Sequence, residues 1–180
     1  MRIKIKRKGI LLLLLPIATA MACGGGNKDE EFLKTLKDKE GYCYADVEWG
    51  MTREETEKAA GVELTEYGVP TLLKTDREIS LYGVKGTELF EFFDDELLDV
   101  QIYFDGENLN DFSEDLIENL EKLYGECDRE FTADSGEEAS CLWEVLDDDG
   151  EQESSMQVTR LYSDGNIVRV ILSSGESQTE

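Results

Sequence analysis

Histidine is absent from this sequence, and proline occurs only twice. Without histidine the chain cannot build a Ser-His-Asp or Cys-His nucleophile system, nor a zinc site with histidine ligands. Basic residues are scarce, with 18 lysines and arginines against 42 aspartates and glutamates, a formal net charge of −24. Such a surface repels phosphate, so nucleic-acid binding is excluded. The apolar run from Ile10 to Ile17 has eight residues, well short of the roughly 20 that a membrane-spanning helix needs.

The N-terminal segment has the three parts of a secretory signal peptide. Five basic residues within positions 2–8 precede Leu11–Leu15, and small residues follow before Cys23. Residues 1–22 are therefore assigned to a signal peptide, which is removed on export. The segment resembles the signal sequences of bacterial lipoproteins, which implies acylation of Cys23 and a lipid-anchored position in the bacterial cell envelope, outside the cytoplasm. Ordinary secretion is the alternative, because Ala20-Met21-Ala22 also fits the A-x-A cleavage pattern.

The mature chain that this predicts is more acidic still. Loss of residues 1–22 leaves 13 basic and 42 acidic residues, a net charge of −29. Because anionic headgroups repel such a surface, we expect contact with the membrane through the N-terminal lipid alone. The acidity indicates solubility outside the cell, and binding of a cation or a basic partner is the alternative interpretation.

One folded domain is expected after the anchor. Residues 23–41 are predicted to be a lipid-anchor tether, glycine-rich and flexible at Gly24 to Lys28, and Asp29–Lys39 has the apolar spacing of a short amphipathic helix. The domain is assigned to residues 42–172. The polar residues 173–180 are predicted to form a flexible tail.

The first half of the domain, residues 42–108, is predicted to be a helix followed by an antiparallel meander. Thr52 and Glu55 form a capping-box pattern that begins the helix, and Gly61 ends it. Acidic residues at positions 94–96 are expected to form a hairpin turn. Alternation with period two indicates strands around Ile79 and Leu81, around Phe90 and Phe92, and around Val100, Ile102 and Phe104.

The second half, residues 109–172, repeats this order of elements. An apolar stripe predicts a helix from about Asn110 to Tyr124, and Gly125 ends it. The strand segments that follow are Cys127–Ala133, Ser140–Leu146, Met156–Tyr162 and Ile167–Leu172. The expected fold class is therefore α+β, with two helix-plus-antiparallel-meander units, either in one shared layered α/β sandwich or as separate sheets. The repeated order suggests an internal duplication.

A short motif at the first predicted helix carries a family resemblance. The run Trp49-Gly50-Met51-Thr52, with Glu54 and Glu55 after it and a meander beyond, resembles the BamE/SmpA-type small lipoproteins. The same elements are similar to the wider β-lactamase inhibitory protein-like fold. The family commonly places Gly-x-Pro close after its helix, whereas here proline comes only at Pro70. The resemblance implies a layered α+β scaffold for protein–protein contact and supplies no catalytic residue.

Carboxylates are the remaining candidates for chemistry. A pair of them hydrolyses glycosides in many enzymes, so a carboxylate-dependent cell-wall hydrolase is one alternative function. Calcium prefers oxygen ligands, which Asp147–Glu151 concentrates. The EF-hand template, however, places Val145 and Met156 at ligand positions. We therefore interpret this segment as a solvated hairpin loop, with calcium as the disfavoured alternative, and we predict no metal site and no cofactor.

Three cysteines remain after Cys23, which is an odd number. Export makes disulfides feasible. If the segments 127–133 and 140–146 pair as a hairpin, a disulfide between Cys127 and Cys141 fits that register; other pairings and three reduced thiols are the alternatives. Cys43 is interpreted as a small buried apolar residue.

Aromatic residues on the predicted strands are expected to fill the core. On the opposite face of the sheet, Leu89, Phe93 and Tyr103 are the predicted partner surface, because an uncovered apolar face marks an interaction site. The sequence thus predicts a lipid-anchored extracytoplasmic binding or scaffold protein, not an enzyme, with an envelope protein as its partner. The alternative is an acidic, cation-responsive or inhibitor-like module that binds a basic partner.

Overall fold

The computed structural model describes residues 25–107, 109–133, 138–161 and 167–175. The predicted signal peptide, Cys23 and the end of the predicted tail lie outside these residues. Within the described ranges, no helix combines the length and the apolar character needed to cross a membrane.

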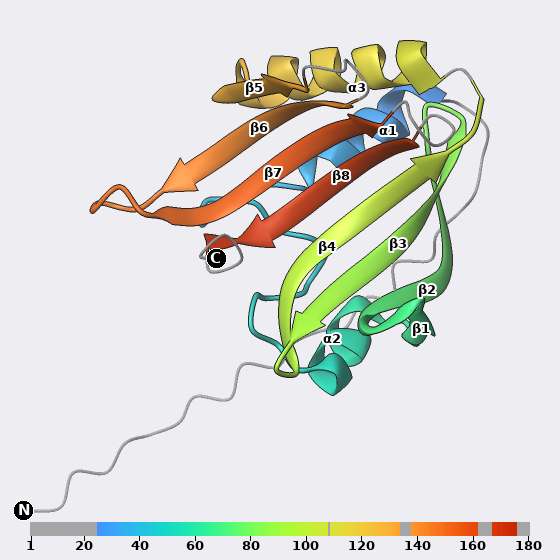
Figure 1. The fold of residues 1–180 in the computed structure, drawn as a ribbon, viewed down its shortest axis with the longest axis vertical. Coiled ribbons are helices and arrows are strands. Elements are labelled where there is room, and N and C mark those ends of the chain that lie inside the picture. Colours follow the sequence, from blue (N-terminus) through green and yellow to red (C-terminus); the bar gives the residue numbers. More distant parts are fainter. Residues whose placement is uncertain (1–24, 108, 134–137, 162–166, 176–180) are drawn as a thin grey trace, which may run out of the picture.

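Three helices and eight strands make up the described part of the chain (Figure 1). The helices are α1 (Gly25–Lys34), α2 (Arg53–Ala60) and α3 (Leu109–Tyr124). The strands are β1 (Thr65–Tyr67), β2 (Val69–Leu81), β3 (Val84–Phe93), β4 (Glu96–Asp105), β5 (Arg129–Thr132), β6 (Glu138–Leu146), β7 (Gln152–Leu161) and β8 (Ile167–Ser174).

All eight strands form one antiparallel sheet in the order β1-β2-β3-β4-β8-β7-β6-β5. The last strands of the two halves, β4 and β8, lie side by side at its centre, with Ile102 opposite Val170. Each half is thus a helix followed by a four-stranded meander, and the two meanders join along their final strands. The predicted α+β fold class is confirmed, and the two units share one sheet.

The core lies on one face of this sheet. A row of side chains crosses five strands in register and is at most 1% exposed: Phe90, Val100, Leu172, Met156 and Trp143. Leucines of α1 and α3 pack into the same core. Because alternate strand residues point to opposite faces, this register puts the apolar set of both halves on the helix-covered side. In Figure 1, α1 and α2 lie behind the sheet on that side.

Local signals placed α2 and the central hairpin correctly. The Thr52 hydroxyl accepts from the Glu55 amide at 3.4 Å, and the Glu55 carboxylate accepts from the Thr52 amide at 3.0 Å, which closes the predicted capping box. Gly61 ends the helix with a φ of 67°. Asp94 and Asp95 connect β3 to β4 with φ values of 50° and 69°, as the twist of a two-residue hairpin turn requires.

Several boundaries differ from the prediction: α1 ends at Lys34 rather than Lys39, and β7 begins at Gln152 rather than Met156. Two further differences have a clear physical reason. Residues 25–28, expected to be a flexible tether, form the first turn of α1, whose Leu33 is 1% exposed; burial of an apolar face stabilises short helices that glycine content alone disfavours. Strand β8 continues through Ser173 to Ser174, inside the predicted tail, because Ser173 pairs with both Asp99 and Ser155.

Candidate binding site in an acidic groove

The loop between α1 and α2 forms one wall of the candidate site. At its far end the Gly50 amide donates to the Leu97 carbonyl of β4 at 3.0 Å. Near its start the Tyr42 amide donates to Ser154 Oγ of β7 at 2.9 Å. The loop is therefore fixed to strands from both halves of the chain, which brings residues about 50 and 110 positions apart into one site.

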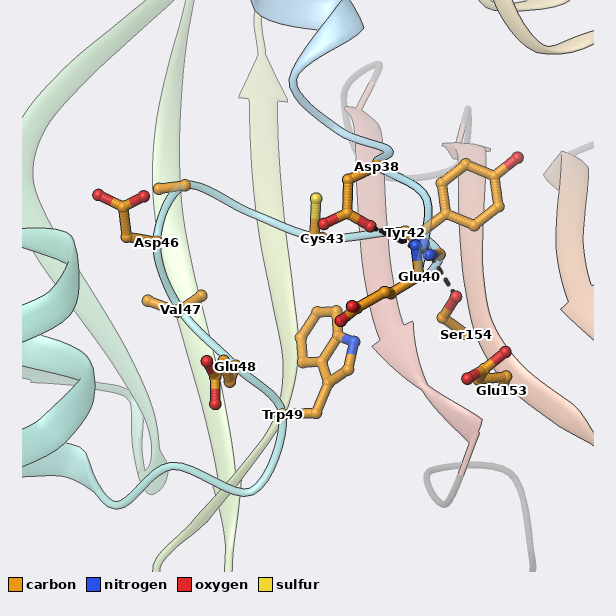
Figure 2. A pocket seen from close by; sticks show the side chains of 12 residues that line it. Asp38, Glu40, Tyr42, Cys43, Asp46, Val47, Glu48, Trp49, Glu153 and Ser154 are labelled. Carbon is orange, nitrogen blue, oxygen red and sulfur yellow. Dashed lines mark hydrogen bonds between the residues drawn. The ribbon is translucent and has the colours of Figure 1, made fainter. Parts of the chain in front are cut away.

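A cavity of about 640 Å³ lies between this loop and the beginning of β7 (Figure 2). Figure 2 shows Trp49 between the loop residues on one side and the β7 residues Glu153 and Ser154 on the other. The acidic residues that line the cavity are Asp38, Glu40, Asp46, Glu48 and Glu153. All five are exposed to solvent, so a ligand in the cavity would meet their carboxyl groups.

A second cavity of about 970 Å³ adjoins the first and shares Trp49 and Glu153 with it. It adds two further carboxylates, Glu96 and Glu151. We call the two cavities together the acidic groove. None of the described residues that line it is a lysine or an arginine.

The composition of the groove selects for a cation. Seven carboxylates without a lining counter-charge attract ammonium and guanidinium groups, which form charge-assisted hydrogen bonds with carboxylates. Trp49 packs against the core and is half-buried at the junction of the two cavities. An indole in such a place adds a cation–π contact, about 0.5–2 kcal/mol depending on desolvation. Lysine or arginine side chains therefore match both features.

Cys43 also lines the groove, and its thiol is not set up as a nucleophile. The side chain is half-buried rather than buried as expected, and Sγ donates to the Thr35 carbonyl at 3.5 Å. Burial, followed by the nearby Asp38 carboxylate, raises the pKa of the Cys43 thiol. A raised pKa keeps the thiol protonated near neutral pH, and the thiolate is the reactive form.

A buried polar network also anchors the loop, at Tyr44. Glu88 of β3 is fully buried, and its carboxylate accepts from Arg77 Nε and Nη2 at 2.8 Å each and from Thr75 Oγ1 at 2.8 Å. The Tyr44 hydroxyl of the loop also donates to it. Burial, with the Glu88 charge next in size, raises the pKa of Tyr44, and the bond to Glu88 raises the pKa of Arg77.

The predicted partner surface is present only in part. Leu89, Phe93 and Tyr103 do lie on the sheet face opposite the core, but their exposure differs. Phe93 is 63% exposed and Tyr103 is half-buried, whereas Leu89 is 2% exposed. Leu89 lies in the middle of β3 between Lys74 and Gln101, long side chains at paired positions, so it offers no surface to a partner. The prediction for Leu89 is wrong.

The two cysteines of the second half are brought together. Cys127 Sγ donates to Cys141 Sγ at a distance of 3.0 Å, and both are free thiols here. Glu130 lies in the same cluster. The acidic hairpin loop has a structural explanation as well: Asp147 Oδ1 accepts from the amides of Asp149 and Glu151, both at 2.9 Å. That carboxylate shapes the turn between β6 and β7.

Sequence reasoning missed the groove because its carboxylates come from separate segments. They come from the loop before α2, from the start of β4 and from the start of β7. Among 42 acidic residues none of these stands out. In the sequence, Trp49 stands out only as the first residue of the Trp49–Thr52 motif. Its flanking acidic residues, Glu48 and Asp46, were the one local signal available.

The fold and the groove together define an acidic α+β protein built from two helix-plus-meander halves. Among solved structures it is similar to the DUF4309 family protein YjgB from Bacillus subtilis subsp. subtilis str. 168, a crystal structure at 2.13 Å resolution. The two share 16% sequence identity with a TM-score of 0.47, over 82% of this chain and 99% of that one. No protein-family profile matches the chain. No curated protein matches it either.

Proposed function

We propose that this chain is a lipid-anchored extracytoplasmic binding protein whose acidic groove takes a lysine- or arginine-rich segment of an envelope protein. One observation carries the proposal: seven carboxylates and a half-buried tryptophan line two adjoining cavities in which no described residue is basic. The groove is open at the surface, so it suits an extended segment of chain better than a small enclosed ligand.

The location in the proposal rests on the N-terminal sequence. The basic, leucine-rich segment and the small residues before Cys23 support export and acylation. The resemblance of the Trp49–Thr52 motif to BamE/SmpA-type lipoproteins supports a role in protein–protein contact. The proposal gives the chain no catalytic activity, so turnover of a cell-wall glycan by the purified protein would contradict it.

The binding test uses hexalysine and hexaarginine peptides as probes, with hexaglutamate as the negative probe. Binding to the purified protein is measured by calorimetry at rising salt concentration. We expect both basic peptides to bind, and we expect the affinity to fall as salt screens the exposed carboxylates. Binding of hexaglutamate, or no binding of either basic peptide at low salt, would contradict the proposal.

Charge reversal in the groove locates the site. The double variant Glu40→Lys/Glu153→Lys places two cations in the groove, and we expect at least a tenfold loss of affinity for hexaarginine. The matched control, Glu63→Lys/Glu66→Lys, changes the net charge equally at exposed positions outside the groove lining. An equal loss in both variants would show that total charge, not the groove, governs binding.

A pull-down from membranes then identifies the natural partner. Lipidated protein is compared with a Cys23→Ala version, and both are compared with the groove variant. The proposal expects a protein that both the lipidated and the Cys23→Ala forms capture and that the groove variant loses. A partner retained by the groove variant would point to the opposite sheet face.

A further inference from the structure

We propose that Cys127 and Cys141 form an intramolecular disulfide in the exported protein, and that Cys43 remains a free thiol. The inference is independent of the groove and of its ligand. It assigns a covalent link between the segment that enters β5 and the neighbouring strand β6.

The geometry places the two sulfur atoms for this bond. They lie 3.0 Å apart, about 1 Å more than the ~2.04 Å of an S–S bond. Hydrogen bonds on both sides hold Cys127 there: Trp143 Nε1 donates to the Gly125 carbonyl at 2.9 Å, and the Asp128 amide donates to the Leu142 carbonyl at 2.8 Å. Only a small rotation of the side chains is needed to close the bond.

The environments of the two thiols set the order of the reaction. Cys127 is half-buried, whereas Cys141 is 7% exposed. Burial, with a further contribution from Cys127, raises the pKa of Cys141 to about 12. The more accessible Cys127 is therefore the residue that meets an oxidant, and Cys141 reacts second.

The oxidant is a disulfide, either that of an exported thiol–disulfide oxidoreductase or that of oxidised glutathione. The Cys127 thiolate attacks one sulfur of the oxidant, forms a mixed disulfide and displaces a thiolate. The Cys141 thiol then loses its proton to solvent and attacks Cys127 Sγ, which displaces the second thiolate. The protein loses two hydrogens, and the oxidant leaves as two thiols.

A metal is the competing use of the same cluster. The carboxylate of Glu130 and the two sulfur atoms lie within 4.8 Å of one another, and a thiophilic ion such as Zn²⁺ would need both thiolates. Among the described residues this cluster offers three ligands, one short of the four that a structural zinc site has. Glu130 is moreover exposed. Stoichiometric zinc in the purified protein, with both thiols reduced, would overturn the proposal.

The test uses full-length protein produced in an exporting host and denatured in an excess of an alkylating reagent. Peptide mass spectrometry should show Cys43 alkylated and the peptides of Cys127 and Cys141 joined, with a mass two hydrogens lower than the sum of the free peptides. Alkylation of both Cys127 and Cys141, or a bond that includes Cys43, would overturn the proposal.

A second measurement tests whether Cys127, rather than Cys141, reacts first with the oxidant. Purified, reduced protein is incubated with oxidised glutathione, and the Cys43→Ser/Cys141→Ser variant is expected to trap glutathione on Cys127. The Cys43→Ser/Cys127→Ser variant should react at least tenfold more slowly at Cys141. Comparable rates would refute the assignment of Cys127 as the entry thiol.

The disulfide should also stabilise the fold, and this effect can be measured without the glutathione reaction. It closes a loop of 15 residues, so reductant is expected to lower the melting temperature of Cys43→Ser by roughly 5–10 °C. The Cys43→Ser/Cys127→Ser/Cys141→Ser variant should show no response to reductant. A wild-type melting temperature that reductant leaves unchanged would contradict a closed disulfide.

Discussion

At the scale of single residues, two carboxylate clusters on β3 and β4 are stabilised by different partners. Glu88 is fully buried on the core side, and four donors from Arg77, Thr75 and Tyr44 surround it. On the other face, Glu91 and Asp99 pair across the strands, and Gln101 Nε2 donates to both at 3.1 Å. The Glu88 carboxylate is thus paired with an arginine, whereas the carboxyl groups of Glu91 and Asp99 share one amide donor.

The Glu91–Asp99 pair makes stability depend on pH. Burial, followed by the nearby Glu91 charge, raises the pKa of Asp99 to about 7. The unfolded chain loses this proton near pH 4, so the contribution of Asp99 to stability falls between about pH 4 and 7 and is constant above. We expect Asp99→Asn to be more stable than wild type at pH 8 by roughly 1–3 kcal/mol, measured by urea unfolding.

The difference between wild type and Asp99→Asn should shrink as the pH falls towards 4. The control is Asp105→Asn at the exposed end of β4, which should follow the wild-type curve throughout. Parallel curves for wild type and Asp99→Asn would show that this carboxyl does not titrate as described.

The burial of Glu88 predicts that loss of its partner Arg77 destabilises the fold more than loss of the surface residue Arg129. Arg77→Ala leaves a fully buried carboxylate without its cation, and we expect the free energy of unfolding at pH 7 to fall by roughly 3–5 kcal/mol. Arg129 pairs with Glu144 from a largely exposed position, where solvent screens its charge, so we expect Arg129→Ala to cost much less than Arg77→Ala. Urea unfolding of Arg77→Ala and Arg129→Ala makes the comparison. Equal losses would contradict the assigned role of the buried network.

At the scale of elements, each half of the chain begins with a helix that a glycine ends. Gly61 and Gly125 both have positive φ values, 67° and 93°. Trp143 Nε1 donates to the Gly125 carbonyl at 2.9 Å, which fixes the end of α3 to β6. Both helix ends are also closed locally, since the Gly61 amide bonds to the Glu57 carbonyl and the Gly125 amide bonds to the Glu121 carbonyl. The Trp143 bond is thus an addition at the end of α3, not a replacement for the local cap.

The caps of α2 give a prediction at this scale. Thr52→Ala removes the hydroxyl that accepts from the Glu55 amide, and Gly61→Ala forces a side chain into a left-handed conformation. Each change is expected to lower the free energy of unfolding by about 1 kcal/mol. Thr71→Ala, at an exposed position of β2, serves as the control with little expected change. A larger loss in the control would show that the caps are not the cause.

At the scale of the whole molecule, the two halves share one sheet and one core. The row from Phe90 through Val100 to Leu172 and Met156 crosses from one half into the other without a break. Separation of the halves would expose this row and leave β4 and β8 as unpaired edges. We therefore expect the halves to unfold as one cooperative unit, although each has its own helix and meander.

Fragments test this unit directly. We expect residues 25–107 and 109–180, produced separately, to lack a cooperative unfolding transition, because each exposes half of the core and an edge strand. Mixing them should restore native near-ultraviolet circular dichroism, since β4 and β8 can pair again. Cooperative unfolding of either fragment alone would show that the halves are separate domains.

The elements themselves could be predicted from the sequence because their signals are local. Thr52, Glu55 and Gly61 mark α2 through capping within a few residues, and the stripe from Phe112 to Leu120 marks α3 through its 3.6-residue period. Alternation of apolar and polar residues indicated the strands, and it also indicated which side chains of each strand face the core. The order helix-then-meander, twice over, followed from these patterns and led to the correct fold class.

Tertiary structure alone decided how the halves meet and what they enclose. Pairing of β4 with β8 joins residues about 70 positions apart, and no local pattern specifies that choice. The burial of Leu89 and the 3.0 Å approach of Cys127 to Cys141 depend on neighbours from other strands. The acidic groove exists because the loop at Trp49 is fixed to β4 and β7. Long-range register decides these features, whereas local chemistry decided the helices and strands.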